Sequence, residues 1–187
     1  MTLTRRSLPL LLAALPAVLG AQEAAEDRAN IGLRMHLQAP MGNLRDLNGG
    51  QNGVSLAGFV DLPQEELRGV SFRPLVQFDY FPKGDDLHIA GNKTRVFAYM
   101  LGVELVWRPN DDQKGPYLMA ALGAQNWRIT TESAGGDTRI GGTKLGANGG
   151  VGLRWNSHLA LEVKAFWSPV DANVRATGVS AGFTWMF

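Results

Sequence analysis

The last segment of the chain alternates between two kinds of side chain. Val179, Ala181, Phe183, Trp185 and Phe187 fall on one parity, and small or polar residues fall on the other. Because successive side chains of a strand point to opposite faces, this pattern predicts a β-strand with one apolar face. The same alternation recurs in seven earlier segments, at residues 31–41, 53–62, 70–81, 95–108, 116–130, 143–155 and 159–168. The sequence therefore predicts eight strands.

Two of these segments depart from strict alternation. Pro74 has no amide hydrogen to donate to a neighbouring strand, so we expect a bulge or distortion there. In 116–130, Leu118 and Leu122 fall on one parity, whereas Trp127 and Ile129 fall on the other. One extra residue at a bulge would bring both pairs to the same face, and bulges are common at the rims of barrels.

The connections between the predicted strands fall into two sets. The first, third, fifth and seventh are rich in glycine and charge, at 42–52, 82–94, 131–142 and 169–176. The others are on average shorter, at 63–69, 109–115 and 156–158. An even number of strands places both termini on one side, with the longer loops on the other. This arrangement is typical of an outer-membrane barrel with periplasmic termini and exterior loops.

The N-terminus has the features of a signal peptide. Arg5 and Arg6 precede an apolar run over 8–19, and Gly20 and Ala21 provide small residues for cleavage. The run is shorter than the roughly 20 apolar residues of a membrane-spanning helix and contains two prolines. We therefore expect a cleavable signal peptide over 1–21, a flexible periplasmic lead over 22–30, and a barrel over 31–187.

Composition narrows the classes of function. The chain has 18 basic and 17 acidic residues, and removal of Arg5 and Arg6 leaves one more acidic than basic residue. This near-neutral balance gives no reason to expect a nucleic-acid partner. The chain has no cysteine, which excludes a lipoprotein anchor, disulfides and thiolate chemistry.

Alternation alone does not decide whether the apolar face meets a protein core or a lipid bilayer. The predicted strands approach the ~9–11 residues that cross a membrane at a tilt, which is longer than ordinary soluble strands. The aromatic residues expected to form girdles at the two membrane interfaces all lie near strand ends: Trp107, Trp127, Trp155, Trp167, Trp185 and Phe187. These features favour an all-β, eight-stranded, antiparallel up-and-down transmembrane barrel; the alternative is a soluble periplasmic β-barrel or sandwich.

Several stretches resemble the small eight-stranded outer-membrane barrels of the OmpA/OmpX and opacity-protein-like type. The likeness is strongest in 115–124 and in 146–154, and it continues through 158–162. The closing strand, which ends on Phe187, also resembles the assembly signal of such barrels. The resemblance implies a monomer in bacterial outer-membrane lipid that the barrel-assembly machinery inserts through this strand. It specifies an architecture and not an activity.

The second face of the predicted strands carries many polar side chains. An eight-stranded barrel is only wide enough for its own side chains, so the charges inside should pair with one another. The alternative is a narrow ion- or proton-conducting channel gated by a salt-bridge switch. The expected interior network comprises Arg34, His36, Gln38, Asp61, Arg73, Gln77, Asp79, Glu104, Asn148, Arg154, Glu162 and Lys164.

Catalytic, cofactor and metal sites have little support in the sequence. Ser157 and His158 are adjacent in a predicted periplasmic turn, on the wrong side for a lipid-modifying enzyme that acts on exterior lipid A. His88 follows two carboxylates in 82–94, a grouping that is more often solvated than metal-bound. We expect no catalytic residue, no cofactor and no metal, and a structural or surface-interaction role exerted through the exterior loops.

Overall fold

The computed structural model describes residues 30–64, 67–109 and 114–187. The predicted signal peptide over 1–21, and residues 22–29 of the predicted lead, lie outside this part of the chain. Both remain predictions.

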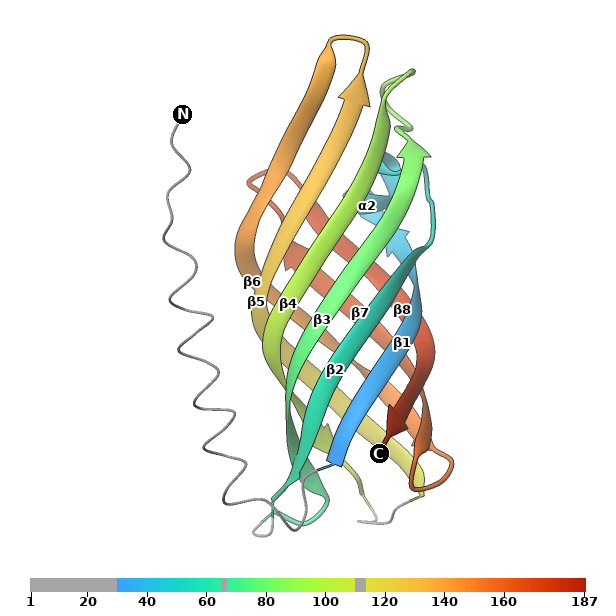
Figure 1. Cartoon of the computed structure of the whole chain (residues 1–187), viewed down its shortest axis with the longest axis vertical. Coiled ribbons are helices and arrows are strands. Elements are labelled where there is room, and N and C mark those ends of the chain that lie inside the picture. The colour runs from blue at the N-terminus through green and yellow to red at the C-terminus, as the bar shows by residue number, and fades with distance from the viewer. Residues whose placement is uncertain (1–29, 65–66, 110–113) are drawn as a thin grey trace.

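Eight antiparallel strands close into one barrel in which every strand pairs with its neighbours in sequence and β8 returns to β1 (Figure 1). The strands are β1 (Asn30–Met41), β2 (Gly53–Pro63), β3 (Val70–Asp85), β4 (Lys93–Trp107), β5 (Gly115–Ser133), β6 (Gly136–Arg154), β7 (Leu159–Pro169) and β8 (Arg175–Met186). The predicted eight-stranded, up-and-down barrel is confirmed. We call the end where β1 begins and β8 finishes the terminal end, and the opposite end the loop end.

A short helix, α2 (Gly42–Leu47), follows β1 at the loop end. It occupies the first part of the predicted loop 42–52, and its Leu44 is fully buried. In the part of the chain that the structure describes, no helix combines the length and apolar character of a membrane-crossing helix.

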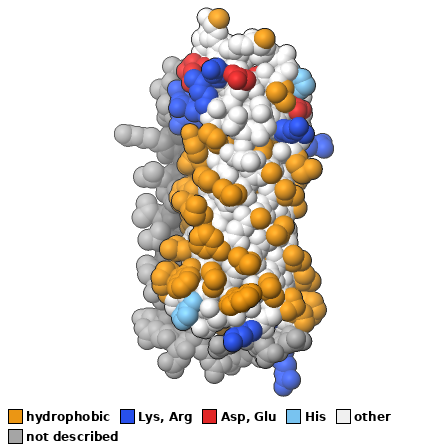
Figure 2. All heavy atoms as spheres, turned by 90° about the vertical axis from the view of Figure 1, so that its right-hand side faces the viewer, with side chains coloured by type: hydrophobic (Ala, Val, Ile, Leu, Met, Phe, Trp, Pro, Cys, Tyr) orange, Lys and Arg blue, Asp and Glu red, His pale blue; other side chains and the backbone are white. Residues whose placement is uncertain are grey.

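The alternation of the sequence separates the outside of the barrel from the inside. Side chains such as Leu37 and Leu122, which are 64% and 59% exposed, face outward, whereas their neighbours Gln38 and Ala121 are buried. On the face seen in Figure 2, apolar side chains form a band between charged residues at the two ends. A soluble monomer rarely exposes so large an apolar surface. The outward face is therefore suited to lipid.

Strand β5 contains no bulge, so this part of the sequence-based interpretation is wrong. Its pairing with β4 and with β6 keeps one register over its whole length. Trp127 and Ile129 therefore lie on the inward face, where both are buried. The switch of parity in the sequence therefore does not mark a change of face. It arises because the inward side chains of β5 become apolar toward the loop end.

The predicted loop 131–142 is mostly strand. β5 and β6 continue as a hairpin, with Ser133 paired to Gly136 across a two-residue turn. β3 and β4 likewise extend to a pairing between Asp85 and Lys93, so the loop predicted at 82–94 is shorter. Glycine and charge are compatible with a strand whose two faces meet water, and for that reason these residues resembled loops.

Pro74 disturbs the ladder without a bulge. The β2–β3 pairing runs to Phe59 and Leu75, and resumes at Leu62 and Phe72 in the same register. The missing proline amide accounts for a gap of this kind. A register shift occurs elsewhere in β3, between Phe81 and Gly84.

Glycines inside the barrel make room for large side chains on the neighbouring strand. Gly152 lies opposite Tyr117, and a Cβ atom added to Gly152 would meet the tyrosine ring at 2.2 Å. Gly32 stands in the same relation to Phe59, also at 2.2 Å. Rings that cover glycines in this way fill a narrow interior without voids.

We predict that Gly152→Ala destabilises the folded barrel by about 1–3 kcal/mol, because the new methyl group overlaps the Tyr117 ring. Gly149→Ala is the matched control: its Cβ atom would meet its nearest neighbour, the Met119 carbonyl oxygen, at 3.5 Å. Urea unfolding in detergent micelles measures both. Equal stability of the two variants would contradict the packing described here.

Candidate functional site

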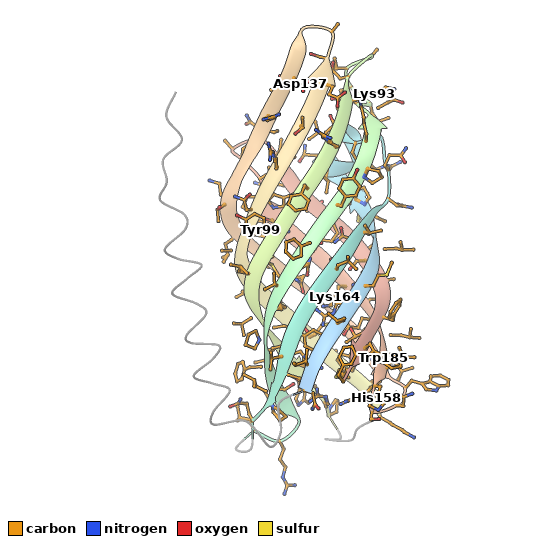
Figure 3. All side chains as sticks on the ribbon, viewed as in Figure 1. Lys93, Tyr99, Asp137, His158, Lys164 and Trp185 are labelled. Atoms are coloured by element: carbon orange, nitrogen blue, oxygen red, sulfur yellow. The ribbon has the colours of Figure 1, made fainter. Side chains whose placement is uncertain are left out.

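The barrel interior holds a buried network of charged side chains, with Glu104 of β4 at its centre. Its carboxylate accepts hydrogen bonds from Arg34 Nη2 at 2.7 Å, Lys164 Nζ at 2.7 Å and Arg73 Nη1 at 3.4 Å. These donors come from β1, β7 and β3, and all four side chains are at most 4% exposed. Figure 3 places Lys164 within the barrel wall, between its two ends. Glu104 therefore links strands from different sides of the barrel.

Glu162 of β7 is the second anion of the network. Arg34 Nε lies 2.6 Å from its Oε2, so Arg34 bridges the two glutamates. The Tyr117 hydroxyl donates to Glu162 Oε1 at 2.7 Å, and His36 Nε2 lies 3.2 Å from Oε2. Buried carboxylates are stable only with such partners.

Asp61 of β2 completes the network toward the terminal end. It accepts from Arg73 Nε at 2.9 Å and from Arg108 Nη2 at 2.8 Å. The Phe59 ring lies under Arg34 and Arg73, with its centroid 5.2 and 4.8 Å from the two guanidinium carbons. Three anions thus face Arg34, Arg73, Lys164 and the partly buried Arg108, which balances most of the buried charge.

Asp79 lies one layer nearer the loop end and is held by amides. Gln38 and Gln77 donate to its Oδ1 at 2.9 Å, and Gln125 donates to its Oδ2 at 3.2 Å. No salt bridge reaches Asp79 from the cations of the described ranges. Neutral amide donors stabilise a buried carboxylate less than cations do, so this layer is separate from the ion-paired one.

An apolar cluster closes the interior at the loop end. It contains Leu44 of α2, Phe81, Ile129, Val170 and Trp127, each at most 2% exposed. The placement of Trp127 in an interfacial girdle is therefore wrong. Its indole Nε1 donates to Ser168 Oγ at 2.9 Å inside the barrel. Sequence position near a strand end did not reveal which face the indole occupied.

Two predicted interior residues lie apart from both polar layers. Arg154 is half-buried at the terminal end, where it donates to the carbonyl oxygens of Asn156 and Ser157, so its assignment to the central network is wrong. Asn148 is partly exposed, and its buried Oδ1 makes no hydrogen bond to the described residues.

The other predicted girdle residues are exposed at the barrel surface. Trp107, Trp155, Trp167 and Trp185 are 44–67% exposed, and Phe187 is 64% exposed. Trp167 lies nearer the loop end, and Trp185 lies at the terminal end beside His158 (Figure 3). Their positions at two levels are compatible with two interfaces.

The residues considered for catalysis and metal binding do not converge. His158 stacks on Trp185 with 6.0 Å between ring centroids, and its Nδ1 lies 2.9 Å from the Met186 carbonyl oxygen. His88 Nε2 lies 3.5 Å from Asp46 Oδ2 at the loop end. Within the described ranges, no three His, Asp or Glu side chains are arranged to hold a metal ion.

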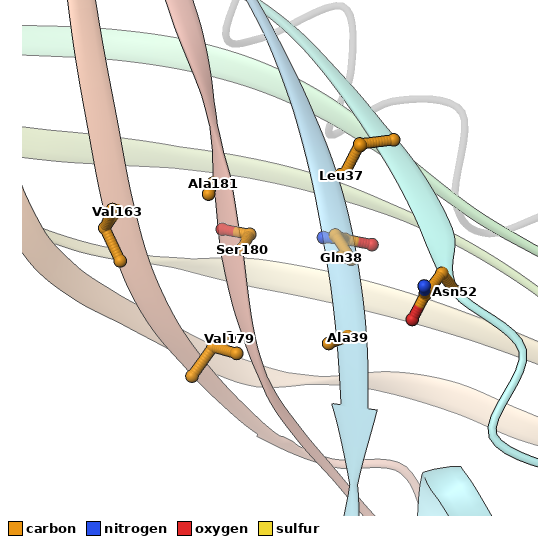
Figure 4. Close-up of a pocket in the computed structure, with 8 residues that line it drawn as sticks. All are labelled: Leu37, Gln38, Ala39, Asn52, Val163, Val179, Ser180 and Ala181. Atoms are coloured by element: carbon orange, nitrogen blue, oxygen red, sulfur yellow. The ribbon is translucent and has the colours of Figure 1, made fainter.

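A hollow on the barrel is lined mainly by small and branched apolar side chains (Figure 4). It lies along β1 and β8, where Ala39 pairs with Val179 and Leu37 pairs with Ala181. Three polar residues, Gln38, Asn52 and Ser180, also border it.

Sequence reasoning missed several members of the interior. Tyr117 and Gln125 belong to β5, and the bulge expected there obscured the inward parity that both residues follow. Thr184 accepts from Arg34 Nε at 3.3 Å but was grouped only as part of a small polar face. Arg108 falls just past β4 and reaches back into the barrel, which no local pattern signals.

Comparisons with known proteins identify the architecture. The barrel superimposes on Ail, the attachment invasion locus protein of Yersinia pestis, with a TM-score of 0.57 and 14% identity over 85% of this chain and 97% of that one. The N-terminal β-barrel domain of Pseudomonas aeruginosa OprF gives 0.56 and 7% over 84% and 97%. Neisserial surface protein A gives 0.52 and 17% over 85% and 97%. This chain has the fold of the small outer-membrane β-barrels.

Sequence comparisons add no closer relationship. No protein-family model matches the chain, and no curated protein matches it. At identities of 7–17%, the structural likeness establishes the fold and leaves the activity open.

We predict that Glu104→Gln destabilises the barrel by about 3–5 kcal/mol, because three buried cations lose a shared anion. Glu132→Gln is the control, since Glu132 pairs with Lys83 on the exposed surface and its loss should change stability little. Denaturant unfolding in micelles measures both variants. A second variant, Glu104→Gln with Lys164→Met, should recover part of the loss, and no recovery would contradict the assigned pairing.

Proposed function

We propose that this chain is a monomeric integral protein of the bacterial outer membrane, with a plugged interior and a structural or surface-interaction role at its loop end. One observation carries the proposal. Apolar side chains cover the outward face of the strands, while the buried charges pair inside the barrel. A β-barrel that spans a bilayer needs this arrangement, in which the apolar side chains face out and the charged ones face in, the reverse of a soluble protein.

The interior supports a plug and not a channel. Glu104, Glu162 and Asp61 are tied to cations from several strands, so ion passage would have to break buried pairs. Beyond Asp79, the apolar cluster around Trp127 presents no charge to a permeating ion. A conducting barrel would be expected to keep a continuous polar path.

The proposed orientation places both termini in the periplasm and the loop end outside the cell. β5 and β6 extend beyond the other strands at the loop end (Figure 1), whereas Arg154 and Leu159 are joined by a short turn at the terminal end. Outer-membrane barrels have short periplasmic turns and longer exterior segments. In the same scheme, the barrel-assembly machinery recognises β8 and Phe187.

A surface-interaction role is supported by the neighbours and by the shape of the loop end. The protein named as an attachment invasion locus protein has been solved in complex with the heparin analogue sucrose octasulfate. In this chain, the segments available for recognition are 42–52, 86–92, 134–135 and 170–174, together with the protruding hairpin. We assign no catalytic role, because Ser157 and His158 form contacts within the terminal end.

We predict that the refolded chain enters phosphatidylcholine vesicles, migrates anomalously on gels unless heated, and leaves the vesicles tight to protons. An ionophore added at the end of each trace controls for intact vesicles. Heat-modifiable migration tests the barrel, and the leak rate tests the plug. A proton leak that Glu104→Gln alters would establish the channel instead, and a chain that stays soluble without detergent would overturn the membrane assignment.

A further inference from the structure

Three arginines lie together on the outward face of the sheet that extends at the loop end. Arg95 of β4 pairs with Thr130 of β5, and Thr130 pairs with Arg139 of β6. Arg128 lies two residues from Thr130 on the same face of β5. Neighbouring strands are about 4.8 Å apart, so Arg95 and Arg139 flank Thr130 at about 10 Å from each other. We call Arg95, Arg128 and Arg139 the arginine triad.

No arginine of the triad forms a salt bridge to a carboxylate of the described residues, although Arg95 attracts the Glu132 carboxylate on the same outward face. All three arginines are exposed, and none forms a salt bridge or side-chain hydrogen bond in those ranges. The nearby carboxylates are Glu132, which pairs with Lys83, Asp85, which lies 3.9 Å from Lys93, and Asp137, which lies farther toward the tip. The triad therefore presents an excess of positive charge.

Thr130 shows how closely the triad side chains gather. It faces outward between Arg95 and Arg139, yet it is only 4% exposed. On an outward face, such burial indicates that long side chains on the neighbouring strands cover the position. Like charges on neighbouring strands repel one another unless an anion binds between them.

The triad lies on the loop-end side of the apolar band, next to the exposed aromatic residues that end this band, which we call the apolar belt. Arg128 pairs with Phe97, whose ring centroid is 6.5 Å from that of Phe78. Tyr99 follows on the same face, toward the terminal end; in Figure 3 it lies below the level of Lys93 and Asp137. Exposed aromatics of this kind mark the boundary between hydrocarbon and headgroups. The triad therefore falls at headgroup level.

We infer that the arginine triad binds the phosphorylated headgroup of a lipid in the leaflet at the loop end. Arginine binds phosphate in a bidentate manner, and its charge does not titrate. The acyl chains of the same lipid would lie along Phe97 and the belt below it, so one ligand satisfies both surfaces. This inference rests on the proposed membrane location and adds a specific lipid-binding site to it.

The test uses lipid A, a phosphorylated glycolipid, and its dephosphorylated form, each titrated into the full refolded chain in nonionic detergent. Native mass spectrometry counts the bound lipid and gives an apparent Kd. We expect lipid A to bind more tightly than its dephosphorylated form. Each single Arg→Gln change in the triad should weaken binding about fivefold, and the triple variant on the order of a hundredfold.

The matched control removes three cations from other faces of the loop end, through Arg45→Gln, Lys144→Gln and Arg175→Gln. It should bind lipid A nearly as the unmodified chain does. The inference is overturned if the triad variant keeps full affinity, if the control variant loses as much affinity, or if the dephosphorylated lipid binds equally. Binding of sucrose octasulfate without binding of lipid A would also overturn it, in favour of a sulfated polysaccharide.

Heat-modifiable migration is recorded for every variant in the same samples. A chain that folds and enters vesicles but does not discriminate between the lipids disproves only the triad site. A chain that does not enter vesicles at all disproves the proposed membrane function. The two failures are therefore distinguishable.

Discussion

A strand surrounded by hydrocarbon can satisfy its amide and carbonyl groups only by pairing along both edges. In this chain that requirement is met because β8 returns to β1, with pairing from Gly32 and Met186 to Met41 and Thr177. Closure fixes the remaining features of the fold. It gives the wall one outward and one inward face, and it makes the enclosed space so narrow that side chains must fill it.

The side chains that fill the narrow interior are arranged in layers along the barrel axis. Glu104, Glu162 and Asp61 share the guanidinium and ammonium groups of residues from several strands, so the pairs also hold opposite walls together. Toward the loop end, amides surround Asp79, and an apolar cluster around Trp127 then closes the space. If the interior is plugged as proposed, the outer surface and the protruding hairpin are the surfaces available for interaction.

The outward face is equally ordered along the barrel axis. Aliphatic residues occupy the middle, exposed aromatics such as Trp185 and Phe97 lie toward the ends, and arginines stand beyond Phe97 on the extended sheet. This order follows the polarity profile of a membrane from hydrocarbon to headgroup. The position of the arginine triad agrees with this profile, because the triad follows the aromatic residues in the direction of the headgroups.

Much of the architecture could be predicted from sequence, because parity reports directly on which face a residue occupies. The inward positions of Arg34, Glu104 and Lys164 follow from this rule alone. The errors arose where parity was overruled by an assumption. Trp127 has inward parity in 116–130, but a bulge assumed in that segment and a girdle assumed for every tryptophan near a strand end both place it outside.

Pairing inside the barrel could not be predicted in the same way. Whether Arg34 meets Glu104 or Asp61 depends on strand tilt and stagger, which bring residues from distant strands to one level. Arg154 had the correct parity for the network but lies at the terminal end, beside the turn carbonyls. The extent of the β5–β6 hairpin was equally hidden, because glycine and charge suit both a loop and a strand exposed to water.

The most direct test compares variants that each retain a single tryptophan, reconstituted into vesicles whose acyl chains carry bromine, a contact quencher of indole fluorescence. We predict strong quenching of a chain that retains Trp185 or Trp167, and little quenching of one that retains Trp127. Quenching of Trp127 together with protection of Trp185 would show that the faces of the barrel wall are assigned the wrong way round.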